Sequence, residues 1–118
     1  MVMGKSEKHL QCDPATLRGI RDAMETLSGG WKLQILLSLK NGARRFGQIS
    51  RDVEGISDKM LSKELKSLET NLLVKRTVHD TFPPSVEYVI TPHADTLQEV
   101  MQALSRWGKL HREEITRF

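Results

Sequence analysis

Apolar residues recur at helical spacing over most of this chain, and the pattern predicts five helices separated by polar or glycine-containing breaks. Asp13 and Pro14 are typical of a helix start, and Gly29-Gly30 ends the first predicted helix. The second, over residues 31–40, is apolar on nearly every side, so we expect it to be the central buried helix. The remaining predicted helices cover residues 46–53, 57–71 and 92–118.

The period changes from helical to alternating in two short segments, residues 74–78 and 86–90, which predicts two β-strands. The segment between them contains Pro83-Pro84, so we expect an antiparallel hairpin with a long, proline-stiffened tip. Thr91 then caps the last helix and Pro92 opens it. A last helix of about 25 residues would be roughly 35–40 Å long, which is long for so small a domain.

This order of elements predicts a mainly α fold with a small β-hairpin (α+β), of the winged helix-turn-helix type. The helix over 57–71 has an apolar stripe and a polar, basic outer face, and the hairpin after it is the wing. We expect residues 12–118 to form one domain that includes dimerisation helices, the long C-terminal helix among them. Residues 1–11 are predicted to be a flexible N-terminal segment.

The distribution of charge supports a basic surface on the middle of the chain. The 118 residues carry a net charge of only +3 and are 38% hydrophobic, which suits one small core. Residues 40–80 alone hold nine Lys and Arg against six Asp and Glu. The excess therefore lies where the helix-turn-helix is predicted, as expected if one face meets phosphates.

Several classes of protein are disfavoured by what the sequence lacks. No apolar run reaches the ~18 residues that a membrane span needs, and residues 1–8 have no apolar signal core. Cys12 is the single cysteine, which excludes an internal disulfide and favours a reducing, cytoplasmic location. We expect no membrane partner.

The sequence also argues against an enzyme. The four histidines are scattered and lack metal-ligand spacing, and Gly29-Gly30 lacks the pattern of a nucleotide loop. We therefore expect no metal and no cofactor. A thiol peroxidase built on Cys12 stays open as an alternative, although the chain offers it no active-site framework.

The detailed sequence resembles one family of bacterial regulators, the HxlR family. The resemblance covers residues 12 to about 108 and implies a winged helix-turn-helix that binds operator DNA as a dimer. It is carried by Cys12-Asp13-Pro14, Gly29-Gly30-Trp31-Lys32, Arg44-Arg45-Phe46, Gly55-Ile56-Ser57-Asp58-Lys59-Met60-Leu61 and Pro83-Pro84-Ser85-Val86-Glu87-Tyr88.

Two positions depart from the pattern of that family. Leu72 stands where a glycine usually precedes the first wing strand, and we expect Asn71 to take the left-handed conformation instead. Ala94 stands where the last helix often has a glycine, and alanine favours a helix. Neither change touches the predicted DNA surface.

The candidate DNA-binding residues lie on the predicted recognition helix, the connection before it and the wing. Lys59 matches a basic position of the resembled family, whereas Ser57 is favoured as a helix cap. One of Arg44 and Arg45 is expected to contact phosphate, the alternative being an ion pair with a nearby acid. The full set is Arg44, Arg45, Ser57, Asp58, Lys59, Ser62, Lys63, Lys66, Arg76, His79 and Ser85, with Lys75 as a further candidate.

We expect a homodimer that reads double-stranded DNA at an inverted-repeat operator. The first and last helices should supply the dimer interface, and Trp31 and Trp107 are expected to be core or dimer contacts. Recognition helices related by a two-fold axis would lie roughly 34 Å apart, one turn of DNA. The alternative is a winged helix devoted to protein–protein contact, without specific DNA binding.

Cys12 has two interpretations. Some members of the resembled family sense oxidants or electrophiles through a cysteine at this position, and a helix N-terminus favours the reactive thiolate. The alternative is a quiet, partly buried cysteine. An oxidant or another small molecule is therefore a candidate effector.

Overall fold

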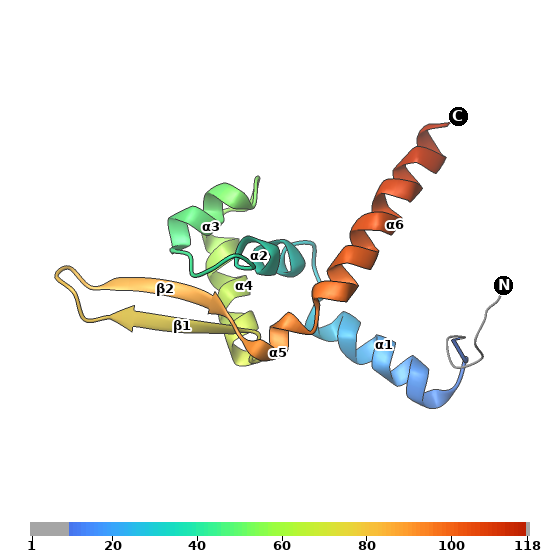
Figure 1. Cartoon of the computed structure of the whole chain (residues 1–118), viewed down its shortest axis with the longest axis horizontal. Coiled ribbons are helices and arrows are strands. Elements are labelled where there is room, and N and C mark those ends of the chain that lie inside the picture. Colours follow the sequence, from blue (N-terminus) through green and yellow to red (C-terminus); the bar gives the residue numbers. More distant parts are fainter. Residues whose placement is uncertain (1–9, 118) are drawn as a thin grey trace.

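The computed structural model describes residues 10–117. Most of the predicted flexible segment, residues 1–9, lies outside the described residues. Along the chain (Figure 1) the elements are α1 (Pro14–Thr26), α2 (Lys32–Ser38), α3 (Phe46–Asp52), α4 (Asp58–Thr70), β1 (Val74–His79), β2 (Ser85–Ile90), α5 (Pro92–Asp95) and α6 (Gln98–Thr116). The prediction of a mainly α fold with one hairpin, in winged helix-turn-helix order, is confirmed.

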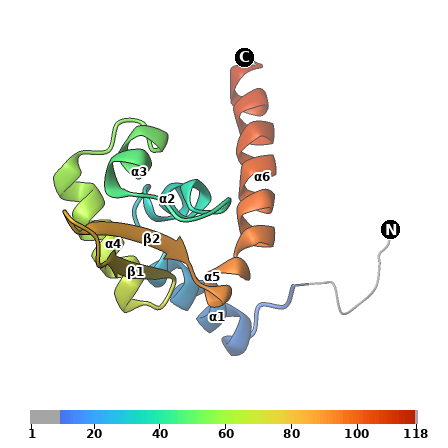
Figure 2. The ribbon, with the colours of Figure 1, turned by 60° about the vertical axis from the view of Figure 1, so that its left-hand side comes forward.

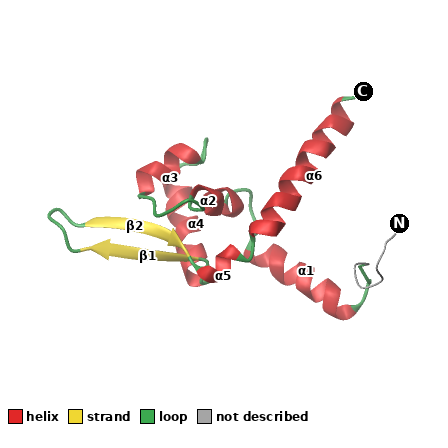
Figure 3. Cartoon of the chain, in the orientation of Figure 1, coloured by secondary structure: helices red, strands yellow, loops and turns green. Residues whose placement is uncertain are grey.

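The core lies where α2, α3 and α4 meet the base of the hairpin (Figure 3). Each helix contributes residues at helical spacing, so one face of each is withdrawn from water. The largest fully buried side chains are Ile35, Leu36, Leu39, Ile49, Leu61, Leu65, Leu68 and Val53. The apolar face of α4 is therefore packed against α2 and α3, which leaves its opposite face outward.

The three predicted helix caps are present. The side chains of Asp13, Ser57 and Thr91 accept hydrogen bonds from the backbone amides of Thr16, Met60 and Ala94, at 2.8, 3.1 and 3.1 Å. Each cap satisfies an amide that the first turn of a helix leaves without a carbonyl partner. The starts of α1, α4 and α5 are therefore determined locally by the sequence.

The two strands pair in antiparallel register, from Val74 opposite Ile90 to His79 opposite Ser85. On the other edge of β2, the backbone of Arg44 exchanges two hydrogen bonds with Tyr88, at 2.8 and 2.9 Å. This bridge attaches the connection before α3 to the wing, which the sequence did not reveal.

The expectation for residues 31–40 was partly wrong. The α-helix is shorter, Lys32–Ser38, and it is amphipathic: Ile35 and Leu36 are buried, but Leu37 is 59% exposed. Lys32, a charged residue, is buried on the same helix. The helix packs mainly on α3 and α4, and its exposed side, which includes Leu37, lines an open depression together with Met101 of α6.

The prediction of one continuous last helix was wrong. The chain forms the short α5, then turns at Thr96 and Leu97 before α6 begins. Thr96 and Leu97 donate backbone hydrogen bonds to His93 and Ala94, three residues back, which tightens the helix at this point. Ala94 is fully buried and Leu97 packs on the core, whereas α6 buries none of its residues. The break lets α5 stay on the core while α6 leaves it.

The expectation for Asn71 was also wrong. Asn71 has a φ of −90°, and Leu72 has the left-handed value of +64°. Leu72 therefore takes the conformation that a glycine would supply at the end of the helix, and its side chain stays 70% exposed. A side chain in this region costs roughly 1–2 kcal/mol.

Leu72→Gly is therefore expected to stabilise the domain by about 1 kcal/mol, because it removes the left-handed penalty and sacrifices little buried surface. Leu72→Ala is the matched control, since it shortens the side chain but keeps the penalty. Urea unfolding of both variants measures the effect. A Leu72→Gly midpoint at or below that of Leu72→Ala would contradict this account of the turn.

Helices α1 and α6 project from the core at the end opposite the tip of the wing (Figures 1 and 2). The radius of gyration is 17.4 Å, against roughly 13 Å for a compact domain of about 100 residues. Neither helix buries a residue in the single chain. Their large exposed apolar residues are Leu17, Ile20 and Met24 on α1 and Val100, Leu104, Trp107, Leu110 and Ile115 on α6.

Candidate nucleic-acid interface

The second helix of the helix-turn-helix, α4, has two sharply different faces. Leu61, Leu65 and Leu68 are buried against the core, which fixes the rotation of the helix about its axis. The opposite side carries side chains that are all exposed: Ser57, Asp58, Lys59, Ser62, Lys63 and Lys66. A helix of this size fits the major groove of DNA, and a polar outer face is what base edges and phosphates require.

The first turn of α4 is fixed by its own cap. Ser57 Oγ accepts the amide of Met60, so this hydroxyl is already engaged, as predicted. Asp58 follows as the acidic residue of the first turn, where it interacts favourably with the helix dipole. Lys59 is therefore the first side chain of α4 with a free cationic group.

A shallow depression of about 280 Å³ lies between α4 and the wing. Ser62 and Lys66 of α4 and Arg76 of β1 line it, together with Leu65, Glu69 and Tyr88. The fold thus brings three of the predicted site residues together from two separate elements. Hydroxyl, ammonium and guanidinium groups in one depression form a set of donors suited to a phosphate.

Arg44 and Arg45 are adjacent in sequence but have different surroundings. Arg44 Nε donates to the carbonyl of Ser38 at 3.4 Å and lies 3.7 Å from Asp52 Oδ2, so the ion-pair alternative holds for this residue. Arg45 is exposed and precedes α3 as its N-cap residue. Of the two, Arg45 is the one whose charge is open to an external anion.

The end of the wing holds His79 and Ser85, which face each other across the hairpin. His79 Nε2 lies 2.6 Å from Glu87 Oε1, so its ring is engaged by a carboxylate on the neighbouring strand. Ser85 is half-buried. Lys75 and Arg76 are exposed on β1. The cationic part of the wing is therefore its β1 strand rather than its tip.

Over residues 10–117, six exposed cations of this region have no carboxylate within 4.0 Å: Arg45, Lys59, Lys63, Lys66, Lys75 and Arg76. They come from the start of α3, the outer face of α4 and the wing. Binding a phosphate there would break no internal ion pair. The arrangement can neutralise a polyanion.

Cys12 lies far from this surface in the sequence, immediately before the cap of α1, and its side chain is exposed. The quiet, partly buried alternative is therefore wrong as regards burial. Next to it, the hydrogen bond from the Thr16 backbone amide lowers the pKa of Asp13 below its ordinary value. The thiol therefore has a carboxylate as its sequence neighbour at neutral pH.

Comparison with known proteins identifies the family. A model of the HxlR-like helix-turn-helix family matches residues 26–116. This chain belongs to that family. An HTH-type transcriptional regulator from Methanothermobacter thermautotrophicus is 34% identical over 99 residues, which are 84% of this chain and 76% of the relative. The HTH-type transcriptional regulator YtfH from Escherichia coli is 33% identical over 95 residues, covering 80% and 75%.

Solved structures of transcription regulators share the fold. The redox regulator HypR in its reduced form superposes with a TM-score of 0.78 at 27% identity, over 85% of this chain and 99% of HypR. The reduced form of the transcriptional regulator YodB from Bacillus subtilis gives a TM-score of 0.68 at 34% identity, over 83% and 91%.

These matches establish the class of the protein. It is a DNA-binding transcription regulator with a winged helix-turn-helix, and the family and its structural neighbours are regulators rather than enzymes. In the described part of the chain, no helix has both the length and the apolarity that crossing a bilayer requires.

The structure adds residues that sequence reasoning missed. The backbone pairing of Arg44 with Tyr88 could not be predicted from the sequence, because a single β-bridge produces no periodic pattern of apolar residues. Phe82, at the tip of the wing, is fully exposed, although its apolar side chain is of a type usually found in cores. Lys32 and Glu64 form a buried ion pair, which the sequence pattern would have assigned to two solvated faces.

Proposed function

We propose that this protein is a cytoplasmic, sequence-specific transcription regulator that binds an inverted-repeat operator as a homodimer, with α4 in the major groove. The observation that carries the proposal is the outer face of α4: its lysines are exposed and, within residues 10–117, have no carboxylate within 4.0 Å, while its inner face is fixed in the core. The side chains on this outer face are not needed for packing, so they are available to contact DNA without loss of folding stability.

Residue roles follow from position. Lys59 and Lys63 lie one turn apart on the exposed face of α4 and are proposed to contact base edges or phosphates, together with Ser62. Lys66 and Arg76, which line the depression beside the wing, are proposed phosphate contacts, as is Arg45 at the start of α3. Arg44, Ser57, Asp58, His79 and Ser85 then have supporting roles, because each is engaged inside the protein or carries no positive charge.

The proposed homodimer is supported by the apolar faces of α1 and α6. Eight large apolar residues, Leu17, Ile20, Met24, Val100, Leu104, Trp107, Leu110 and Ile115, are 43–63% exposed on these two helices. Burying such surface is favourable by about 25 cal/mol per Å². Since both helices lie at the end away from the wing (Figure 1), pairing two copies there would leave both α4 faces open.

The test is selection of binding sites from random double-stranded DNA by the intact protein. We expect enrichment of an inverted repeat whose half-sites are centred roughly 34 Å apart, one turn of B-DNA. An enriched single half-site would contradict the dimeric part of the proposal. No enrichment from a folded, dimeric protein would contradict sequence-specific binding itself.

Sensing through Cys12 is a second candidate function. The thiol is exposed at the start of α1, which belongs to the proposed dimer interface. Among the structural neighbours, HypR is a redox regulator with reduced and oxidised structures, and YodB has reduced and diamide-treated structures. We propose that oxidation or alkylation of Cys12 alters the pairing of the two copies and so their spacing on DNA.

Cys12→Ser is expected to bind operator as tightly as the wild type and to lose the response to diamide and quinones. Because no other cysteine exists in the sequence, any disulfide formed must either link two copies or join Cys12 to the thiol of another compound. Operator release is measured before and after treatment, with non-reducing electrophoresis to detect the linked dimer. An equal response of wild type and Cys12→Ser would exclude the sensor role.

A further inference from the structure

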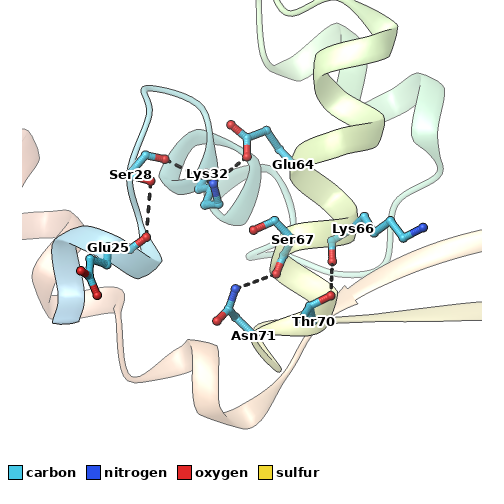
Figure 4. Close-up of polar contacts among 8 residues, drawn as sticks. All are labelled: Glu25, Ser28, Lys32, Glu64, Lys66, Ser67, Thr70 and Asn71. Atoms are coloured by element: carbon cyan, nitrogen blue, oxygen red, sulfur yellow. Dashed lines mark hydrogen bonds and ion pairs between the residues drawn. The ribbon is translucent and has the colours of Figure 1, made fainter.

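A buried ion pair joins the recognition helix α4 to α2 (Figure 4). Lys32 Nζ lies 2.6 Å from Glu64 Oε1, and the two side chains are only 9% and 8% exposed. Glu64 stands in the middle of α4, beside the buried leucines of its inner face. Neither side chain reaches the outer face of α4, so the pair takes no direct part in the proposed DNA contacts.

The same pair contacts the turn between α1 and α2, residues 27–31. Lys32 Nζ also donates to the carbonyl of Ser28 at 3.3 Å. Gly29 has a φ of +86°, and a Cβ at this position would lie 3.4 Å from Glu64 Oε2, so the backbone of the turn passes close to the carboxylate. Since α1 itself buries no residue, the place where α1 leaves the domain is tied to α4 through this cluster.

Stability alone does not explain such a pair. Removing two charges from water is costly, and replacing a buried ion pair by apolar residues of similar volume is often neutral or stabilising. Three leucines would hold α4 on the core without it, but apolar contacts permit small rotations and shifts. An ion pair between Lys32 on α2 and Glu64 on α4 favours a single arrangement of these two helices.

We propose that Lys32 and Glu64 are positioning residues that fix the orientation of α4 relative to the α1–α2 turn, and so determine operator selectivity rather than general DNA affinity. The proposal rests on the proposed function, in which α1 takes part in the dimer and α4 reads bases. Base contacts tolerate displacements of only about 0.5 Å, whereas phosphate contacts by long Lys and Arg side chains are more forgiving.

The decisive variant is Lys32→Met with Glu64→Leu, which replaces the pair by apolar groups of similar size. We expect its urea midpoint to equal or exceed that of the wild type, its affinity for random DNA to stay within about twofold, and its preference for operator over random DNA to fall at least tenfold. It should also discriminate less well against operators whose half-sites are moved apart by one base pair.

Two further variants separate positioning from simple damage to the core. Glu64→Gln keeps an oxygen that accepts from Lys32 Nζ, so we expect it to retain most of the selectivity even if it is less stable. Leu68→Met is the control for a volume-conserving core change on the same helix, and it should leave selectivity unchanged. The proposal would be overturned if the double variant kept wild-type selectivity. It would also be overturned if Leu68→Met lost as much selectivity as the double variant.

Hydrogen exchange of the DNA-free protein tests the same proposal independently of DNA. Amides of α4 should exchange faster in the double variant at equal global stability, since the restraint on that helix is gone.

If the wild type prefers no DNA sequence, the proposed function fails, and unchanged α4 exchange would then overturn the positioning role as well. If the double variant does not fold, Glu64→Gln and its α4 exchange decide: wild-type selectivity with protected α4 amides supports the proposal, and selectivity lost with exchange unchanged overturns it.

Discussion

A chain carrying Leu104→Glu and Trp107→Glu is expected to be monomeric at micromolar concentration and to bind its operator roughly a hundredfold more weakly, because the second half-site no longer adds to the first. Both side chains are exposed in the single chain, at 49% and 61%, so the fold of each copy should survive. Trp107 stacks on His111 with ring centroids 4.8 Å apart, one turn along the same exposed side of α6. In a dimer, carboxylates at these positions would be buried without cationic partners, which strongly disfavours association.

Sizing by light scattering, circular dichroism and operator binding together measure this effect. Lys109→Glu is the matched control, because it adds negative charge to the opposite side of α6 and should leave the dimer intact. A double variant that stays dimeric would show that the copies associate elsewhere. A monomer that binds operator as tightly as the wild type would contradict the claim that operator affinity depends on the dimer.

Lys59→Ala is expected to weaken operator binding by roughly 1–3 kcal/mol, with Lys63→Ala and Arg45→Ala in the same range. These side chains are exposed and have no carboxylate within 4.0 Å in the described chain, so their removal should not destabilise the fold. A phosphate contact reduces affinity for all sequences and lowers the salt slope by about one, whereas a base contact relaxes the preference at one position. The salt dependence therefore assigns a role to each residue.

Lys109→Ala serves as the control for losing one positive charge far from α4 in the sequence. It should shift affinity only slightly and equally for all DNA. Unchanged operator affinity in Lys59→Ala, Lys63→Ala and Arg45→Ala together would be incompatible with this surface as the DNA-binding face.

The elements that the sequence predicted well are those with a local physical signal. Ser57 and Asp13 cap their helices as expected, and the alternation of residues 74–78 and 86–90 produced the hairpin. The stripe of Leu61, Leu65 and Leu68 determined which face of α4 is outward. The candidate residues on that face followed directly from helical geometry.

The errors arose where tertiary packing decides. The break before α6 depends on Ala94 and Leu97 packing on the core while α6, apart from Met101 near its start, projects away from it, and no glycine or proline marks the break. The left-handed residue is Leu72 rather than Asn71, because the chain must turn one residue later to bring Leu73 and Val74 into the core. The engagement of Arg44 by Asp52 likewise depends on residues distant in sequence.

The central claim, that this protein binds a particular DNA sequence, is tested most directly by fluorescence anisotropy on the DNA upstream of its gene and of the neighbouring gene, with excess non-specific competitor. We predict tight, competitor-resistant binding that weakens about a thousandfold between 50 and 200 mM salt if ~6 phosphates are contacted. Binding that competitor abolishes would leave the operator to be found by selection. No salt-dependent binding of any DNA by the folded, reduced dimer would contradict the account and favour a winged helix devoted to protein–protein contact.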